Sequence, residues 1–423
     1  MTYKIFTLGC KVNEYESEAI SELLENHGYY ASENPDICIV NTCTVTNKAD
    51  SKSRKLLRSI KRKYPKALVI AVGCLVQNSK DDLSNLEYDI AIGNRDKMKI
   101  IDYIKSYDKK TSYLQDMNKA SFENMNLNNF KRTRAYIKIE DGCDNYCSYC
   151  IIPFVRGHVR CKKHEEVIAE AKRLIAHGHK EIVLTGIHTG HYTDGDYSFA
   201  DLISDLVKLE GLERLRISSV EITELDNKFL DILKNSKVLV NHMHIPLQSG
   251  SNEILKQMNR KYDKEYFIKK INQIRKIRPN ISITTDVIVG FPGETDELFR
   301  ETIETIKKIK FTKVHVFPYS DRKGTKASKM INHVPEKIKK ERVNILLKLS
   351  KTLEIEYMNK FLNKKLTFIP EKFGDGFLTG HTENYLFIRA TSKENLIGQV
   401  VDIYTKEINY PYIDSEILVK SKI

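Results

Sequence analysis

Short apolar runs alternate with amphipathic stretches in the first quarter of the chain. The apolar runs cover residues 4–8, 36–40 and 67–72. Between them, residues 14–27 and 48–63 carry apolar side chains at helical spacing. Strands that alternate with helices are typical of a parallel sheet with right-handed crossovers. The pattern therefore predicts a parallel-sheet α/β domain over residues 1–102.

The alternation stops in a polar, weakly periodic stretch at residues 103–133, which we expect to be a linker. It then resumes, and six runs have the length and composition of strands: residues 135–139, 181–184, 214–218, 240–245, 282–289 and 313–317. Six strands with helices between them predict a partial (β/α) barrel over residues 134–335. In such barrels the functional residues lie on loops that follow the carboxyl ends of the strands.

The pattern changes again at the end of the chain. Residues 336–363 form one long helical pattern, and residues 364–423 have the pattern of short strands between glycine-containing turns. Such a pattern is typical of a small all-β barrel. The expected fold class is therefore α/β, with an N-terminal α/β domain, a central partial barrel, a connecting helix and a C-terminal β-barrel.

Composition narrows the class of protein. The chain has 423 residues, of which 41% are hydrophobic and 30% charged, which excludes a disordered or collagen-like chain. No apolar run approaches the roughly 18 residues of a membrane-spanning helix, and the first residues lack a signal-peptide pattern. We therefore expect a cytoplasmic protein without a membrane partner. In that compartment, eight cysteines favour metal or redox chemistry over structural disulfides.

The charge balance favours an anionic partner. Lysine and arginine exceed aspartate and glutamate by 13, although a generally lysine-rich composition also explains this excess. Within residues 52–66 no acidic side chain interrupts a run of eight cations: Lys52, Arg54, Lys55, Arg58, Lys61, Arg62, Lys63 and Lys66. We expect this face to have no acidic partner. Because unrelieved like charge destabilises a helix, we expect the face to contact RNA phosphates instead of being covered by solvent alone. We expect Lys131, Arg132 and Arg134 to extend it.

Three cysteines stand close together just after the first expected barrel strand. Cys143, Cys147 and Cys150, here called the central triad, are spaced C-x3-C-x2-C. Three thiolates can hold three irons of a [4Fe–4S] cluster, which leaves the fourth iron open for a substrate or cofactor. A structural zinc site is the alternative, but it normally takes four ligands, and His158 is the only further candidate nearby. The spacing therefore favours a cluster.

Three other cysteines lie far apart in sequence but in equivalent places. Cys10, Cys43 and Cys74, here called the N-terminal triad, each follow one of the first three expected strands. Parallel strands end at one edge of a sheet, where open α/β sheets bind ligands. The placement predicts a second three-thiolate cluster with an open iron, the alternative being three buried apolar cysteines. For Cys38, inside a strand, we expect core packing, and for Cys161 no ligand role.

These motifs carry a resemblance to a known family. Residues 142–153 resemble the signature of radical S-adenosylmethionine enzymes. With the N-terminal triad and the terminal barrel, the whole chain resembles the methylthiotransferases, and residues 364–423 resemble their RNA-binding TRAM domain. Residues 9–13 and 41–46 resemble the members that act on N6-threonylcarbamoyladenosine at position 37 of tRNA. Residues 185–188 depart from many radical enzymes, because they lack the acidic side chain that holds the methionine amino group.

The resemblance implies a radical reaction that puts a methylthio group on C2 of the adenine. A cluster on the central triad would bind S-adenosylmethionine at its open iron and release a 5′-deoxyadenosyl radical after one-electron reduction. A cluster on the N-terminal triad would supply or hold the sulfur, and a second S-adenosylmethionine would supply the methyl group. The expected partners are the anticodon stem-loop of tRNA and an electron-donor protein. The implied S-adenosylmethionine contacts are Gly186, Ser219, Glu221, Gln248 and Asp286.

Other functions stay open at this point. The same chemistry could serve isopentenyladenosine in tRNA or an aspartate of a ribosomal protein, and only Lys11 and Val12 argue against these substrates. A protein of another class, a non-catalytic RNA-binding protein stabilised by metal, would hold zinc and would leave S-adenosylmethionine intact. Three-ligand sites disfavour that class.

Overall fold

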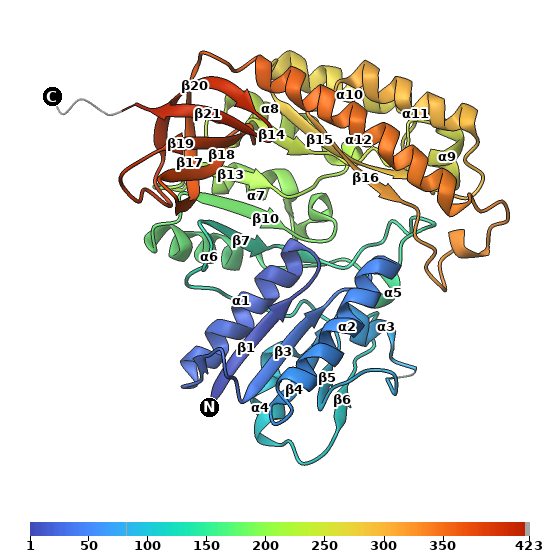
Figure 1. Cartoon of the computed structure of the whole chain (residues 1–423), viewed down its shortest axis with the longest axis vertical. Helices are drawn as coiled ribbons and strands as arrows, with labels where there is room; N and C mark the ends of the chain where they lie inside the picture. Colours follow the sequence, from blue (N-terminus) through green and yellow to red (C-terminus); the bar gives the residue numbers. More distant parts are fainter. Residues whose placement is uncertain (82, 419–423) are drawn as a thin grey trace.

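The N-terminal region is built on one parallel sheet. The computed structural model describes residues 1–81 and 83–418, and Figure 1 shows three regions along the chain. The sheet of the first region has the order β2-β1-β3-β4-β5-β6, and every neighbouring pair is parallel. Its strands are β1 (Thr2–Thr7), β2 (Tyr30–Ala31), β3 (Ile37–Thr42), β4 (Leu68–Gly73), β5 (Ile90–Ile92) and β6 (Thr111–Tyr113). Its helices are α1 (Lys11–Asn26), α2 (Asn47–Lys63), α3 (Cys74–Asn78), η1 (Lys97–Lys99) and α4 (Ile100–Lys105).

Burial on both faces explains the apolar composition of these strands. All six residues of β3, near the middle of the sheet, are buried. Ile37 and Ile39 pack among side chains of α1 and α4, whereas Cys38 and Val40 pack on the opposite face against Leu57 of α2. The expected parallel-sheet domain and the core position of Cys38 are confirmed. The sheet also includes β6, so this region continues past residue 102 into the segment expected to be a linker.

The central region consists of two parallel half-sheets. The first has the order β13-β10-β7 and the second the order β14-β15-β16, and a bridge between Leu215 and Leu239 connects them. The strands are β7 (Arg134–Lys138), β10 (Glu181–Thr185), β13 (Arg214–Ile217), β14 (His242–His244), β15 (Ser282–Val289) and β16 (Lys313–Pro318). Each strand overlaps one of the six expected runs, so the partial barrel is confirmed.

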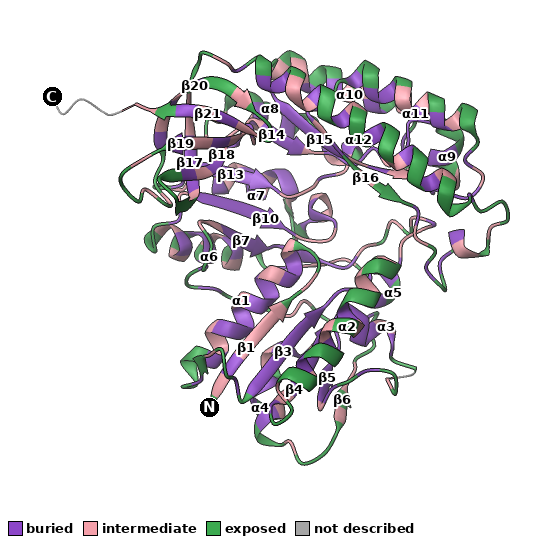
Figure 2. Ribbon diagram, viewed as in Figure 1, coloured by how far each residue is buried: buried purple, intermediate pink, exposed green. Residues whose placement is uncertain are grey.

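Helices cover the outer faces of the half-sheets, and their exposed sides point outward in Figure 2. Their apolar sides meet the strands in the largest hydrophobic core of the molecule. The helices are α6 (His164–Ala176), α7 (Phe199–Leu206), α8 (Asn227–Asn235), α9 (Asn252–Gln257), α10 (Lys264–Ile277) and α11 (Asp296–Ile309). Shorter elements are β8 (Glu140–Asp141), α5 (Ile152–Arg156), β9 (Arg160–Cys161), η2 (Thr189–His191), β11 (Thr193–Asp194), β12 (Tyr197–Ser198), η3 (Ile222–Glu224) and η4 (Ala327–Lys329).

A closed barrel ends the chain. The helix α12 (Glu336–Asn359) leads into five strands of order β17-β18-β19-β21-β20, so the expected β-barrel is confirmed. Arg214 of β13 fixes the barrel to the central region, because its guanidinium donates to the backbone oxygens of Thr367 at 3.0 Å and His381 at 3.1 Å. Residues 419–423 of the expected barrel lie outside the described residues. The strands are β17 (Lys365–Gly374), β18 (Phe377–Thr382), β19 (Phe387–Thr391), β20 (Val401–Asn409) and β21 (Tyr412–Ile417).

The structure also bears on membranes. Over residues 1–81 and 83–418, no helix is both long enough and apolar enough to span a bilayer.

Candidate functional site

The central triad stands on one loop, between β8 and α5. Gly142, just before the triad, has φ +89°, and a Cβ there would lie 2.0 Å from the backbone oxygen of His158, so only glycine fits. The backbone nitrogen of Cys143 donates to Gly157 at 3.0 Å, and that of Cys150 donates to Cys147 at 2.9 Å. Local turns therefore fix all three cysteines, which are half-buried.

The N-terminal triad stands at the carboxyl ends of β1, β3 and β4, which are neighbours in the sheet. Gly9 has φ +106°, and a Cβ there would lie 2.9 Å from the Cys43 Cβ, so the segments of Cys10 and Cys43 are in close contact. Burial raises the pKa of the Cys43 thiol to about 11, and Cys74 and Cys10 add to the rise. The three cysteines thus gather at one edge of the sheet.

Neither triad has the spacing of a single-ion site. Among the described residues, only His188, His191 and Glu224 bring three ligand atoms within 4.8 Å of one another. His158, the candidate fourth zinc ligand, is paired with Asp144, with 2.5 Å between Nδ1 and Oδ1. In each triad at least two ligand atoms therefore lie more than 4.8 Å apart, which is wider than ligands around one zinc ion, whereas a multi-iron cluster takes each sulfur on a separate iron.

A buried ionic network joins the two triads. Arg156, at the end of α5 and fully buried, donates to Glu16 at 3.1 Å, to Asp141 at 2.9 Å and to Asn13 at 3.0 Å. Glu16 lies on α1, the helix that begins just after Cys10. Its carboxylate also accepts hydrogen bonds from the Lys97 ammonium at 2.6 Å and the Lys138 ammonium at 2.8 Å. Burial opposes its ionisation, but the charges of Arg156, Lys138 and Lys97 hold the pKa of Glu16 well below its usual range.

Two asparagines link this network to the N-terminal triad. Asn13 Nδ2 donates to the backbone oxygens of Leu8 at 2.7 Å and Thr42 at 3.0 Å, which ties the ends of β1 and β3 together. Asn94 Nδ2 lies 3.5 Å from the Cys74 sulfur and 2.8 Å from the Val155 backbone oxygen of α5. The N-terminal triad and the helix that follows the central triad thus form one packed unit.

Polar side chains surround the central triad. Arg260 Nη1 lies 3.2 Å from the Cys147 sulfur, and its Nη2 is paired with Glu221. Glu140 Oε2 accepts from the backbone nitrogens of Ile187 at 2.8 Å and His188 at 2.6 Å. Burial raises the pKa of Glu140 to about 8. Glu140 thus brings to residues 185–188 the carboxyl group that this segment itself lacks.

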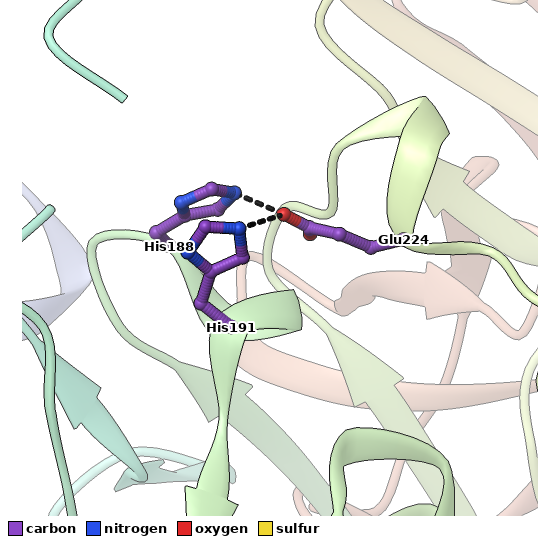
Figure 3. Close-up of side chains that lie close together, drawn as sticks. All are labelled: His188, His191 and Glu224. Atoms are coloured by element: carbon purple, nitrogen blue, oxygen red, sulfur yellow. Dashed lines mark ion pairs between the residues drawn. The ribbon is translucent and has the colours of Figure 1, made fainter. Parts of the chain in front are cut away.

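Figure 3 shows a second group beside this loop, in which His188 and His191 point toward Glu224. His191 Nε2 lies 3.4 Å from Glu224 Oε1, His188 is paired with the same oxygen, and the two rings are 3.7 Å apart. His188 Nδ1 is 3.8 Å from the Cys143 sulfur. The sequence alone does not reveal this group, because Glu224 comes from another loop and the three residues match no linear motif.

Four of the expected cofactor contacts follow the ends of strands, and Asp286 lies inside β15. Gly186 follows β10, and a Cβ there would lie 2.7 Å from Glu140 Oε2. Ser219 follows β13, and its backbone oxygen accepts from Thr189. On the second half-sheet, the backbone nitrogen of Gln248 donates to Asp286 at 2.8 Å. The fifth expected contact is Glu221. Its carboxylate is paired with Arg260 and is therefore not free to bind the cofactor.

Cys161 has its own partners. Its sulfur lies 3.4 Å from the backbone nitrogen of Thr193 and 3.8 Å from the backbone oxygen of His191. Burial raises the pKa of its thiol to about 11. Cys161 thus lies in β9, and its sulfur contacts the segment from η2 to β11.

The expectation that the cationic stretch has no acidic partner is wrong for two side chains. Arg54 is paired with Asp50 at 2.7 Å, and Lys61 with Asp89 at 2.6 Å. The three cations expected to extend this stretch are also paired. Lys131 pairs with Glu25 at 3.0 Å, Arg132 with Glu14 at 3.0 Å, and Arg134 with Glu371 at 3.2 Å. Five cations that this stretch places on α2 remain exposed and make no ion pair within residues 1–81 and 83–418: Lys52, Lys55, Arg58, Arg62 and Lys63.

Comparison with known proteins agrees with this geometry. Residues 137–306 match the Radical SAM superfamily, and residues 2–93 match a family described as uncharacterized protein family UPF0004. The radical S-adenosylmethionine methyltransferase TsrM from Kitasatospora setae, solved with cobalamin and a [4Fe–4S] cluster, has a TM-score of 0.55 at 15% identity. The match covers 75% of this chain and 74% of that one, and it shows a shared fold.

Relatives of known function are much more similar. The threonylcarbamoyladenosine tRNA methylthiotransferase MtaB of Bacillus subtilis (strain 168) is 41% identical over 98% of this chain and 96% of its own. Its namesake in Thermotoga maritima is 38% identical over 96% and 95%. A tRNA-2-methylthio-N(6)-dimethylallyladenosine synthase of Lachnoclostridium phytofermentans is 33% identical over 99% and 96%. The chain therefore belongs to the radical S-adenosylmethionine tRNA methylthiotransferase family.

Proposed function

We propose that this chain places a methylthio group on C2 of N6-threonylcarbamoyladenosine at position 37 of tRNA. The observation that carries the proposal is the pair of cysteine triads joined by the buried network around Arg156. The choice of substrate rests on identity. The relative named for threonylcarbamoyladenosine is 41% identical, whereas relatives named for dimethylallyladenosine are 33% and 34% identical.

The residues present fit two [4Fe–4S] clusters, one on each triad. Each triad offers three sulfur ligands, while Cys38 and Cys161 are engaged elsewhere. Burial raises the pKa of the Cys43 thiol to about 11 and of the Cys150 thiol to about 12, so the positive charge of iron is what would hold them as thiolates. When bound, the two clusters supply one-electron chemistry at the central triad and a site for sulfur at the N-terminal triad.

The chain's own side chains orient this site. Arg260 holds a positive charge against Cys147, and Glu221 keeps that guanidinium in place, so Glu221 acts through Arg260. Glu140 fixes the turn after β10 through two backbone nitrogens. We propose that one S-adenosylmethionine serves as the radical source and a second as the methyl donor. The contacts of these molecules would be Gly186, Ser219, Gln248 and Asp286.

The exposed cations of α2 support contact with the anticodon stem-loop. Five of them lack ionic partners among the described side chains, and phosphate oxygens would neutralise them. The one-electron reduction also requires an electron-donor protein, which completes the proposed set of partners.

Nucleoside analysis tests the proposal. Total tRNA from a strain that lacks this chain is compared with its parent by liquid chromatography and mass spectrometry. We expect 2-methylthio-N6-threonylcarbamoyladenosine to vanish and its unmethylthiolated precursor to remain. Expression of the intact chain should restore the nucleoside, whereas Cys10→Ala or Cys143→Ala should not. Loss of the dimethylallyl counterpart alone would show that the substrate is wrong, and no change in any nucleoside would contradict the whole proposal.

A further inference from the structure

A cavity of about 270 Å³ lies where all three regions of the molecule meet. Its walls include Arg216 and His242 from the two half-sheets, Tyr385 from the C-terminal barrel, and Lys11 from the start of α1. Ser218, next to the expected cofactor contact Ser219, also lines it. The cavity therefore extends from Lys11, which follows Cys10 in the chain, past the half-sheets to the C-terminal barrel. Its volume suits a substituent better than a whole nucleotide.

Lys11 gives this cavity an unneutralised positive charge. The other wall cations are paired: Arg134 with Glu371 at 3.2 Å, Arg216 with Glu181 at 2.6 Å, and Lys313 with Glu354 at 3.0 Å. Within the described parts of the chain, half-buried Lys11 makes no such pair. A cation left over on the wall of a cavity favours an anionic ligand.

Another part of the wall is aromatic and carries an unpaired polar atom. The Tyr385 ring stacks on His242 with centroids 4.7 Å apart and on His381 at 4.5 Å. His242 is only 7% exposed, and its Nε2 lies 3.2 Å from the Thr284 hydroxyl. Its Nδ1 has no hydrogen-bond partner in the described structure. Buried polar atoms are nearly always paired, so an unpaired ring nitrogen on a cavity wall points to a ligand with a polar group.

We propose that this cavity holds the anionic N6 substituent of the target adenine, with Lys11 contacting its carboxylate and His242 Nδ1 a second polar group. The proposal rests on the proposed function and deepens it. A threonylcarbamoyl group carries a carboxylate and a hydroxyl, whereas a dimethylallyl group offers nothing to either side chain. Lys11 directly follows Cys10. An N6 substituent bound by Lys11 therefore keeps the attached purine beside the N-terminal triad. Lys11 and His242 are therefore specificity-determining residues.

A binding experiment with paired RNAs tests the role of Lys11. One anticodon stem-loop carries threonylcarbamoyladenosine, and the other carries its carboxamide, which has the same shape without the charge. Affinity is measured anaerobically by fluorescence anisotropy with the iron-loaded enzyme, without S-adenosylmethionine. We expect the intact enzyme to bind the carboxylate RNA about tenfold more tightly or better. Lys11→Met should remove that preference, and Lys11→Arg should keep most of it.

Controls separate the cavity from the fold and from general RNA binding. Iron content and the electron paramagnetic resonance spectrum of each variant show whether the N-terminal cluster is intact. Lys52→Met, on exposed α2, should weaken both RNAs equally and leave their ratio unchanged. His242→Phe keeps the ring stack and should weaken both threonylcarbamoyl RNAs without changing affinity for a dimethylallyl RNA.

Two negative results have different meanings. If Lys11→Met retains the preference for the carboxylate while its clusters are intact, the cavity assignment is wrong and the proposed function is untouched. If the intact enzyme methylthiolates only the dimethylallyl RNA, the proposed function fails, and the cavity assignment fails with it.

Discussion

Each of the two cysteine triads presents three thiol ligands, but the chain brings the three cysteines together in different ways. The central triad stands on a single loop, where Gly142 and two backbone hydrogen bonds set the positions of the thiols. The N-terminal triad is assembled from the ends of three strands, so its geometry depends on the register of the whole sheet. One site is therefore defined by local chain geometry, and the other exists only once the domain has folded.

Their electrostatic surroundings differ as well. Near the N-terminal triad, Arg156 is locked between the ionised carboxylates Glu16 and Asp141, and all three are buried. Near the central triad, Arg260 has one carboxylate partner, and burial favours the neutral form of Glu140. The first site is held by a dense ionic network that spans two regions, and the second by separate hydrogen bonds.

Loss of a single cysteine should have the largest effect and should separate the two triads. Cys143→Ala and Cys43→Ala each leave two thiolates, so each variant should lose the iron of one cluster and all methylthiolation. Only Cys143→Ala should also abolish reductive cleavage of S-adenosylmethionine, because we assign that step to the central triad. Iron analysis and chromatography of the cleavage products check both results.

Cys161→Ala is the matched control for these variants. Its sulfur makes polar contacts with the backbone of His191 and Thr193 and packs at the edge of the central hydrophobic core, so iron content and activity should stay close to those of the intact enzyme. Cleavage of S-adenosylmethionine that survives in Cys143→Ala would contradict the division of roles between the triads.

The two triads can be predicted from the sequence for different reasons. The central triad follows from spacing alone, and the N-terminal triad follows from the strand that precedes each of its cysteines. The network around Arg156 could not be predicted, because Glu16, Lys97 and Asp141 come from separate elements and belong to no periodic pattern. The same holds for the pairing of Lys61 with Asp89, which depends on a contact between distant segments.

Removing the arginine beside each triad should destabilise the two sites unequally. Arg156→Gln removes one of the two cations that pair with both Glu16 and Asp141, while Lys138 stays in place, so the variant should cost about 3 kcal/mol of unfolding free energy. Arg260→Gln leaves only Glu221, whose side chain retains 16% exposure, and should cost about 1–3 kcal/mol. Denaturant unfolding of the iron-loaded proteins measures both values. Equal losses would contradict the contrast between a network and isolated contacts.

The two sites should also respond to pH in opposite directions. The pKa of Glu16 is lowered by its cations, so its stabilising contribution is present above the ordinary glutamate pKa and is lost as the pH falls. The pKa of Glu140 is raised by burial to about 8, so its contribution is present at low pH and is lost as the pH rises toward 8. Glu140→Gln should therefore remove up to about 4 kcal/mol of destabilisation between pH 5 and 8.

Thermal and denaturant unfolding across pH 2–9 would check this result. Glu16→Gln is the paired variant, and it should lower stability at neutral pH and flatten the acid side of the profile. If both variants flattened the same side, the opposite electrostatic settings of the two sites would be wrong.

The smallest expected effect concerns α2, the helix that lies in the chain between Cys43 and Cys74 of the N-terminal triad. Its exposed cations include Lys52, Lys55 and Arg58, whereas the loop of the central triad has no comparable run. Replacing Lys52, Lys55 and Arg58 with glutamine should weaken tRNA binding and lower the slope of log affinity against log salt by about 1 for each phosphate that is no longer neutralised. Lys131→Gln should change this slope little, because Glu25 already neutralises Lys131 at 3.0 Å.

Reductive cleavage of S-adenosylmethionine without RNA should stay the same in the triple variant, since that reaction belongs to the central triad. An equal loss of cleavage would mean that α2 supports the fold of both sites and does not serve RNA alone.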